Sequence, residues 1–121
     1  MSISKALTSD FESIFYVDVL TDFYLEFHTG KNGELEIRPG GVDFFSDIEE
    51  KLLADVAEAD REKLREALGK TNLLRWVGQQ ETVEIPFMKM KNGVPTPCSI
   101  QTIKSRESDT NHIVLGVRNC S

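Results

Sequence analysis

The sequence predicts a single domain of the α+β class, in which several short helices pack over one face of a five-stranded antiparallel sheet. Runs of β-branched and aromatic residues fill the first and last thirds of the chain, and helical apolar patterns fill the middle. With 121 residues, 40% of them apolar, the chain is large enough for one core and too small for a second. The predicted order is a helix, two strands, three helices and three strands.

The first third of the chain predicts an N-terminal helix followed by a hairpin. Residues 1–10 indicate a short amphipathic helix, because apolar residues recur there at helical spacing. Two strands are predicted over residues 14–20 and 23–28, joined by a turn at Thr21-Asp22. Glycine and proline then favour a loop-rich stretch over residues 30–41. The apolar stripe of the N-terminal helix is expected to consist of Ile3, Ala6, Leu7 and Phe11.

Three short helices are predicted in the middle of the chain. The first is expected to begin behind Asp43, whose side chain would cap it. The second would be capped by Asp60 and stopped by Gly69, and the third would be capped by Thr71 or Asn72. The residues expected to face inward are Phe45, Ile48, Leu52, Leu53 and Val56 in the first helix, Leu64, Ala67 and Leu68 in the second, and Leu73, Leu74 and Val77 in the third.

The last third predicts three strands, over residues 81–91, 96–104 and 112–118. Asn92-Gly93 favours a two-residue hairpin between the first two, because both central positions of a type I′ turn need positive φ. Pro86 lacks a backbone N–H, so its strand is expected at an edge of the sheet. On the last strand, the residues expected to face the interior are Ile113, Leu115 and Val117.

The net charge of −6 is concentrated in the predicted helices. Between residues 43 and 66, nine acidic residues stand against four basic ones, which is typical of a solvated helix face. Such a surface repels phosphate groups and therefore argues against nucleic-acid binding and direct membrane contact. No apolar run approaches the ~18 residues that span a bilayer, so we expect a cytoplasmic protein. Cys98 and Cys120 show no metal-ligand spacing and are expected to be reduced.

Few residues in this sequence suit catalysis. His28 and His112 have no serine or cysteine partner at motif spacing, and Asp18 and Asp22 flank a turn that they are expected to cap. We therefore predict a protein that is not an enzyme, with no catalytic residue and no metal site. The alternative from another class is a small α+β isomerase or dehydratase with Asp18 or His28 as general base. Those folds place long helices first, whereas here a hairpin precedes the helices.

Short motifs near both ends and in the middle stand in the order and spacing of one known family. The predicted hairpin opens with Phe15-Tyr16-Val17-Asp18, followed by Thr21-Asp22 and Tyr24. Two of the predicted helices open with Asp43-Phe44-Phe45 and Asp60-Arg61-Glu62. The last six residues are Gly116-Val117-Arg118-Asn119-Cys120-Ser121. Together they resemble the PAS domains attached to bacterial diguanylate cyclases, over residues 11–121. Ala57-Glu58-Ala59-Asp60-Arg61 lacks the His and Pro of the family's His-Pro-x-Asp-Arg. Asn119 stands where the family's Gly-x-x-Asp-Ile-Thr ending has its aspartate.

The resemblance implies a single PAS domain over residues 11–121 that serves as a sensory or regulatory part of a bacterial signal-transduction protein. The expected parent is a GGDEF diguanylate cyclase or, next, a histidine kinase. A small molecule would bind, or the domain would act as a ligand-free dimerisation module. Homodimers would form in part through the helix of residues 1–10. The signal would leave through Gly116 and Asn119 to a C-terminal output domain.

No cofactor is expected, because the residues that PAS cofactors need are missing. Residues 70–80 lack the histidine of haem-binding members, and neither Cys98 nor Cys120 stands in the photoreactive motif of flavin-binding members. A ligand pocket is expected in the apolar interior between the sheet and the helices. Tyr16, Tyr24 and Trp76 would supply its polar groups. The residues predicted to line this pocket are Phe15, Tyr16, Val17, Tyr24, Phe45, Ile48, Leu52, Leu74, Trp76, Val83, Ile85, Phe87 and Val114.

Overall fold

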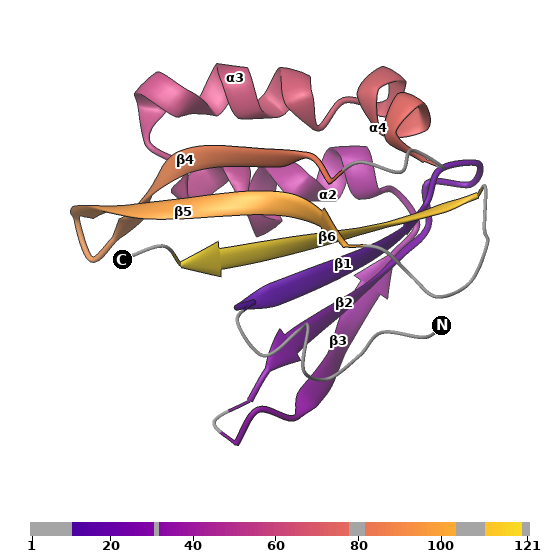
Figure 1. Ribbon diagram of the computed structural model, residues 1–121, viewed down its shortest axis with the longest axis horizontal. Coiled ribbons are helices and arrows are strands. Elements are labelled where there is room, and N and C mark those ends of the chain that lie inside the picture. Colours follow the sequence, from indigo (N-terminus) through magenta and orange to yellow (C-terminus); the bar gives the residue numbers. More distant parts are fainter. Residues whose placement is uncertain (1–10, 31, 78–81, 104–110, 120–121) are drawn as a thin grey trace.

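The computed structural model describes residues 11–30, 32–77, 82–103 and 111–119, and it is an α+β fold. Its sheet is antiparallel and has six strands in the order β3-β2-β1-β6-β5-β4, with helices over one face (Figure 1). The strands are β1 Ser13–Asp18, β2 Tyr24–Thr29, β3 Leu35–Gly41, β4 Glu84–Lys91, β5 Val94–Ile103 and β6 His112–Asn119. The helices are α2 Phe44–Lys51, the 3-10 helix η1 Leu53–Asp55, α3 Glu58–Ala67 and α4 Lys70–Trp76. The helix predicted over residues 1–10 lies outside the described residues.

The sixth strand, β3, corrects the prediction of a loop over residues 30–41. Leucine and isoleucine alternate with charged residues from Leu35 to Arg38, which is the two-residue period of a β-strand. This segment pairs with β2, and Ile37 lies opposite Phe27. The pairing shifts between Tyr24 and Glu26, so β3 carries one extra residue there. A Cβ on Gly40 would collide with the carbonyl oxygen of Tyr24, which explains why a glycine stands at this position near the end of the strand.

The helix starts agree with the sequence prediction in one case and differ in two. Asp43 caps α2, because its carboxylate accepts the Ser46 N–H at 3.2 Å. α3 begins two residues before Asp60, and the Asp60 carboxylate instead accepts the Met88 N–H of β4 at 2.8 Å. α4 begins at Lys70 with Gly69 at its N-cap, so neither Thr71 nor Asn72 caps it. The prediction for Asp60 was wrong because its carboxylate bonds a distant strand. The prediction for Thr71 or Asn72 was wrong because α4 begins earlier, at Lys70.

Two apolar clusters lie on the two faces of the sheet. The larger one fills the space between the sheet and the helices, where Ile113, Leu115 and Val117 of β6 all point, as predicted. The smaller one lies on the face opposite the described helices and includes Val114. The larger cluster consists of Phe15, Val17, Val19, Tyr24, Phe44, Ile48, Leu52, Leu53, Val56, Leu64, Leu68, Leu73, Phe87, Cys98, Ile100, Ile113, Leu115 and Val117, and the smaller of Phe11, Ile14, Phe27 and Val114.

The edge of the sheet at β4 is covered by the chain itself, as Figure 1 shows for the neighbouring α3. The Met88 carbonyl accepts the Ala57 N–H at 2.8 Å, and the Pro86 carbonyl accepts the Lys63 ammonium at 3.2 Å. The Asp60 carboxylate takes the Met88 N–H. Pro86 therefore stands on an edge strand, as the sequence predicted. The hairpin at Asn92-Gly93 is also confirmed, with φ of 53° and 78°.

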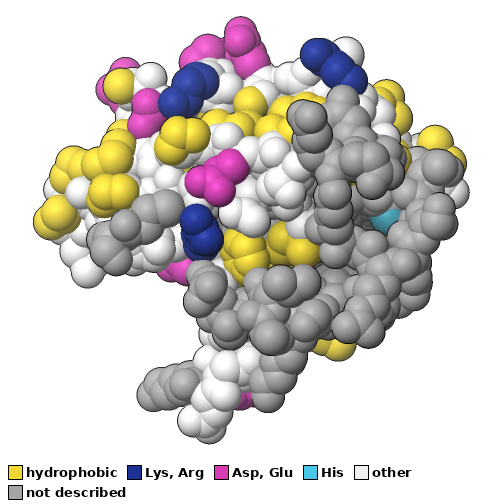
Figure 2. All heavy atoms as spheres, viewed as in Figure 1, with side chains coloured by type: hydrophobic (Ala, Val, Ile, Leu, Met, Phe, Trp, Pro, Cys, Tyr) yellow, Lys and Arg dark blue, Asp and Glu magenta, His cyan; other side chains and the backbone are white. Residues whose placement is uncertain are grey.

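Acidic side chains gather over α3 at the top of the view in Figure 2. No helix among the described residues is long and apolar enough to cross a membrane.

Candidate functional site

The residues predicted to line one pocket are divided by the sheet. Those on the helix side pack against one another in the larger cluster: Phe15, Val17, Tyr24, Ile48, Leu52 and Phe87 are buried, and Phe45, Trp76 and Ile85 are partly buried against them. Tyr16 and Val114 face the other side and belong to the smaller cluster, because successive strand residues point to opposite faces. Leu74 is 47% exposed on α4. Val83 is half-buried and donates its N–H to the Thr102 hydroxyl at 3.0 Å.

A cavity of about 420 Å³, which we call the helix cavity, opens on the helix side. Its apolar lining comes from α2, η1 and the end of α3, and it includes Phe45 and Ile48 of the predicted pocket. Charged residues stand at its rim. The lining residues are Asp22, Phe45, Ile48, Glu49, Leu53, Arg65, Leu68, Gly69 and Lys70.

Two ion pairs hold the rim of the helix cavity. Lys70, at the start of α4, bonds the Asp22 carboxylate at 2.9 Å and so ties α4 to the β1–β2 turn. Arg65 of α3 forms two bonds to Glu49 of α2, at 2.6 and 3.1 Å. These hydrogen bonds raise the pKa of Arg65 and lower the pKa of Glu49, so both groups stay charged. The rim therefore presents neutralised charge pairs that a polar ligand group could replace.

A second cavity of about 490 Å³, which we call the sheet groove, lies at one end of the face opposite the described helices. Tyr16 of β1 and His112 of β6 stack there with parallel rings 4.6 Å apart. Phe23, Leu25 and Val42 stand exposed beside them. Such a concentration of exposed apolar side chains is characteristic of interaction surfaces. The groove is lined by Tyr16, Asp18, Phe23, Tyr24, Leu25, Gly40, Gly41, Val42 and His112.

Asp18 caps the turn between β1 and β2, as the sequence predicted. Its carboxylate accepts the Leu20 N–H at 2.8 Å and the Thr21 N–H at 3.1 Å, and it lies 3.6 Å from His112 Nε2. The hydrogen bond from Leu20 is the main cause that lowers the pKa of Asp18. A carboxylate with a lowered pKa is a weaker base than an ordinary one.

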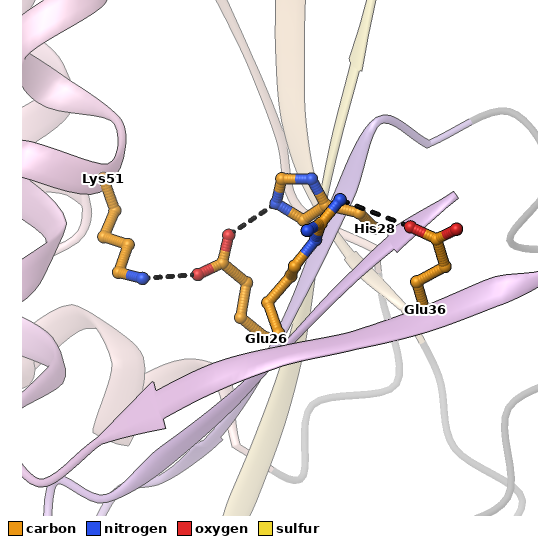
Figure 3. A network of polar contacts seen from close by, with 5 residues as sticks. Glu26, His28, Glu36 and Lys51 are labelled. Atoms are coloured by element: carbon orange, nitrogen blue, oxygen red, sulfur yellow. Dashed lines mark hydrogen bonds and ion pairs between the residues drawn. The ribbon is translucent and has the colours of Figure 1, made fainter. Parts of the chain in front are cut away.

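A buried carboxylate connects β2 to α2 (Figure 3). The Glu26 side chain is only 8% exposed, and its two oxygens bond Lys51 Nζ at 2.8 Å and His28 Nε2 at 2.6 Å. Lys51 closes the last turn of α2, so this network fixes the end of that helix over the sheet. On the neighbouring strand, Glu36 pairs with Arg38 at 3.2 Å.

The predicted output residues lie on β6, in the middle of the sheet between β1 and β5. A Cβ on Gly116 would come within 2.5 Å of the Phe11 ring and 2.7 Å of the Ile103 side chain. The Phe11 and Ile103 side chains therefore fill the space that a side chain at position 116 would need. Asn119 is exposed at the end of β6, opposite Cys98 of β5.

Two features of these sites escaped sequence reasoning. Glu26 and Lys51 are 25 residues apart, and nothing in the local pattern indicates that they meet. The Lys70–Asp22 pair joins residues 48 apart. Phe44, next to the Asp43 cap, is buried in addition to the predicted Phe45, which is partly buried.

Within the described ranges, no three His, Cys, Asp or Glu side chains lie close enough together to hold a metal ion. No protein-family model matches the chain, and neither a curated protein nor a solved structure matches it.

Proposed function

We propose that this chain is a PAS-type regulatory domain that binds a small molecule in the helix cavity and passes the resulting change through β6 to an output domain. The observation that carries the proposal is the Lys70–Asp22 pair at the rim of that cavity, with an N–O distance of 2.9 Å. This pair joins the helical layer to the turn that leads into the sheet. A ligand that replaces it changes how α4 sits on the sheet.

The size and chemistry of the helix cavity suit a small amphipathic ligand. Its volume of about 420 Å³ falls within the roughly 300–1,000 Å³ of typical ligand sites. Ile48, Leu53 and Leu68 supply an apolar wall, and the Lys70 ammonium lies 6.0 Å from the Phe45 ring centroid. A ligand with an apolar body and one charged group would bury its body against the wall and pair with the rim.

A continuous set of hydrogen bonds runs from the cavity rim to β6. The Asp22 N–H bonds the Asp18 carbonyl at 2.8 Å, and the Val19 N–H bonds the Asn111 carbonyl, directly before β6, at 2.8 Å. β6 then runs through the core to Asn119. We propose that the domain has two arrangements, with the Lys70–Asp22 pair closed or opened by the ligand, and that β6 reports the difference.

The proposed setting follows from the resemblance and from the order of elements. Strands, then helices, then three strands form the order expected for a PAS domain, and the helices cover one face of an antiparallel sheet. We propose a cytoplasmic, bacterial signal-transduction protein with a diguanylate cyclase or, as the next choice, a histidine kinase as its output.

Native mass spectrometry of the freshly purified chain tests for a co-purified ligand, and a thermal-shift screen of small aromatic and aliphatic acids and amines tests for added ones. We expect a hit whose binding is weakened by Phe45→Trp, which fills the cavity, and kept by Leu74→Trp, on the exposed side of α4. Equal binding by both variants would place the ligand elsewhere.

Output is tested by fusing the chain, through Ser121, to a diguanylate cyclase catalytic domain. Asn119→Ala removes about 1 kcal/mol of local bonding at an exposed strand end. We expect the thermal midpoint to change little and the ligand-dependent cyclase activity to change about fivefold, because output depends on a balance of two states. Unchanged activity with unchanged stability would reduce this junction to a tether.

A ligand-free dimerisation module is the second candidate. It is favoured by the larger cluster, whose members are at most 6% exposed, and by the exposed apolar side chains of the sheet groove. In this case native mass spectrometry would show bare protein, and Leu25→Ser in the groove would weaken self-association without changing any ligand response.

A further inference from the structure

We propose that two copies of this chain pair through the outer edge of β3, with the two β3 strands antiparallel and centred on Ile37, so that one sheet runs through both chains. This surface consists of residues other than 1–10, through which the sequence predicted a homodimer, and other than those that line the helix cavity. The proposal does not depend on the ligand.

The direction of the β3 backbone groups follows from the register. Residue pairs of an antiparallel ladder alternate between hydrogen-bonded and non-hydrogen-bonded. The Gly30 N–H bonds the Glu34 carbonyl at 2.7 Å, so Glu34 belongs to a bonded pair. Glu36 and Arg38 lie two and four residues further along β3, so they also form bonded pairs and their backbone groups point toward β2. The N–H and C=O groups of Leu35 and Ile37 therefore point outward, away from the sheet.

This edge is open over the part of the chain that the structure describes. No described residue bonds the outward N–H or C=O of Leu35 or Ile37, and the Ile37 side chain is 73% exposed. Unprotected edge strands are templates for pairing with another strand. Pro39 has no N–H and stands two residues beyond Ile37, which limits the pairing to a short segment.

The charges on β3 complement one another when the strand meets its own copy. In an antiparallel pair centred on Ile37, Glu36 lies opposite Arg38 of the second copy, and Arg38 lies opposite Glu36 of the second copy. Opposite charges that face each other across two strands stabilise the pairing, and like charges oppose it. Within one chain the two residues already lie on the same face, 3.2 Å apart. The sequence Glu-Ile-Arg is thus self-complementary.

The apolar side of the same segment also matches. Ile37 lies opposite Ile37 of the second copy, on the face that carries Phe27 and Leu35. A β-branched pair at this position covers side chains that are otherwise exposed. The contact is short and buries less than the ~1,200 Å² typical of stable complexes. We therefore expect a weak dimer that forms at micromolar or higher concentration.

Sedimentation velocity of the full chain over a range of concentrations tests the pairing with a charge exchange. Glu36→Arg and Arg38→Glu each place like charges opposite one another twice, so each should weaken dimerisation at least about fivefold. The double variant Glu36→Arg/Arg38→Glu restores opposite charges and should restore the dimer. Ile37→Lys should weaken it as well, whereas Val94→Lys, at an exposed apolar position on the β4–β5 hairpin, should not.

Circular dichroism at each concentration checks that every variant is folded. A chain that stays monomeric up to millimolar concentration overturns the proposal. So does a dimer that survives both single charge reversals, or one that is lost only when residues 1–10 are deleted.

Discussion

The two edges of the sheet end in different ways, although each edge strand contains a proline. At β4 the chain closes its own edge, because Ala57, Asp60 and Lys63 bond the backbone of Pro86 and Met88. At β3 the described part of the chain leaves Ile37 exposed on the edge, where a proline and a bulge limit pairing. A proline therefore marks an edge strand without deciding whether that edge is covered. What decides it is the segment that the chain brings alongside.

The largest effect is expected from breaking the bulge that shapes the open edge. In Gly40→Ala the new Cβ collides with the backbone carbonyl of Tyr24, which cannot move without shifting β2. We expect a loss of about 2–3 kcal/mol in the free energy of unfolding, measured by urea denaturation. Gly69→Ala, where the nearest atom lies at 3.2 Å, serves as the control and should change stability less. Equal changes in both variants would contradict the bulge as the cause.

The covered edge is tested by removing the carboxylate that closes it. Asp60→Ala leaves the part-buried Met88 N–H without its acceptor, and we expect it to cost about 1–2 kcal/mol of unfolding free energy. Glu36→Ala on the open edge removes a solvent-exposed pair and should cost less than about 0.5 kcal/mol. Chemical denaturation of the two variants in parallel checks the contrast, and a larger cost for Glu36→Ala would reverse it.

The tie between β2 and α2 gives a third, intermediate effect. Lys51→Met leaves the buried Glu26 carboxylate with His28 as its remaining partner among the described residues, and we expect a loss of about 1 kcal/mol. Lys63→Met, which removes one surface bond at the covered edge, is the matched control and should have a smaller effect. If both variants unfold at the same denaturant concentration, the ion pair between Glu26 and Lys51 does not contribute more to stability than the surface bond of Lys63.

The smallest effect concerns acid stability at the β1–β2 turn, away from both edges. The backbone N–H of Leu20 lowers the pKa of Asp18 below its ordinary value of 3.8. A lowered pKa in the folded state contributes stability above pH 3.8 that is lost as pH falls through the folded value. Asp18→Asn should therefore flatten the acid limb of the stability curve below that pH. Thermal midpoints measured between neutral pH and acid test this, and an unchanged limb would contradict it.

Local chemistry made part of the fold predictable. Asn92-Gly93 determined its hairpin, Asp43 its cap and Pro86 its edge, because each acts through atoms of its own or neighbouring residues. The sequence did not predict the strand at Leu35 because Pro39-Gly40-Gly41 favours a loop, whereas the bulge accommodates those residues within the strand.

The candidate site was less predictable, because its residues meet through the tertiary fold. Period two correctly assigned Ile113 and Leu115 to the helix side, and the same rule excludes Tyr16 and Val114 from it. Their inclusion in the pocket followed residue type and ignored strand parity. Asp60 was assigned to a cap because its sequence neighbours resemble a helix start, whereas its partner Met88 is 28 residues away. Contacts of this kind carry no local signal.

The burial of Cys98 on β5 makes the rate at which its thiol reacts a measure of how often the interior opens. Its side chain is 1% exposed, between Phe87 of β4 and Asn119 of β6, on the side covered by the helices. A thiol reagent reaches the sulfur only when these layers part, so the modification rate counts openings of the interior. With Cys120→Ser as the background, that rate reports separately on each ligand or partner that slows the opening. The Cys98 thiol is thus a built-in probe of how often the interior of the domain opens.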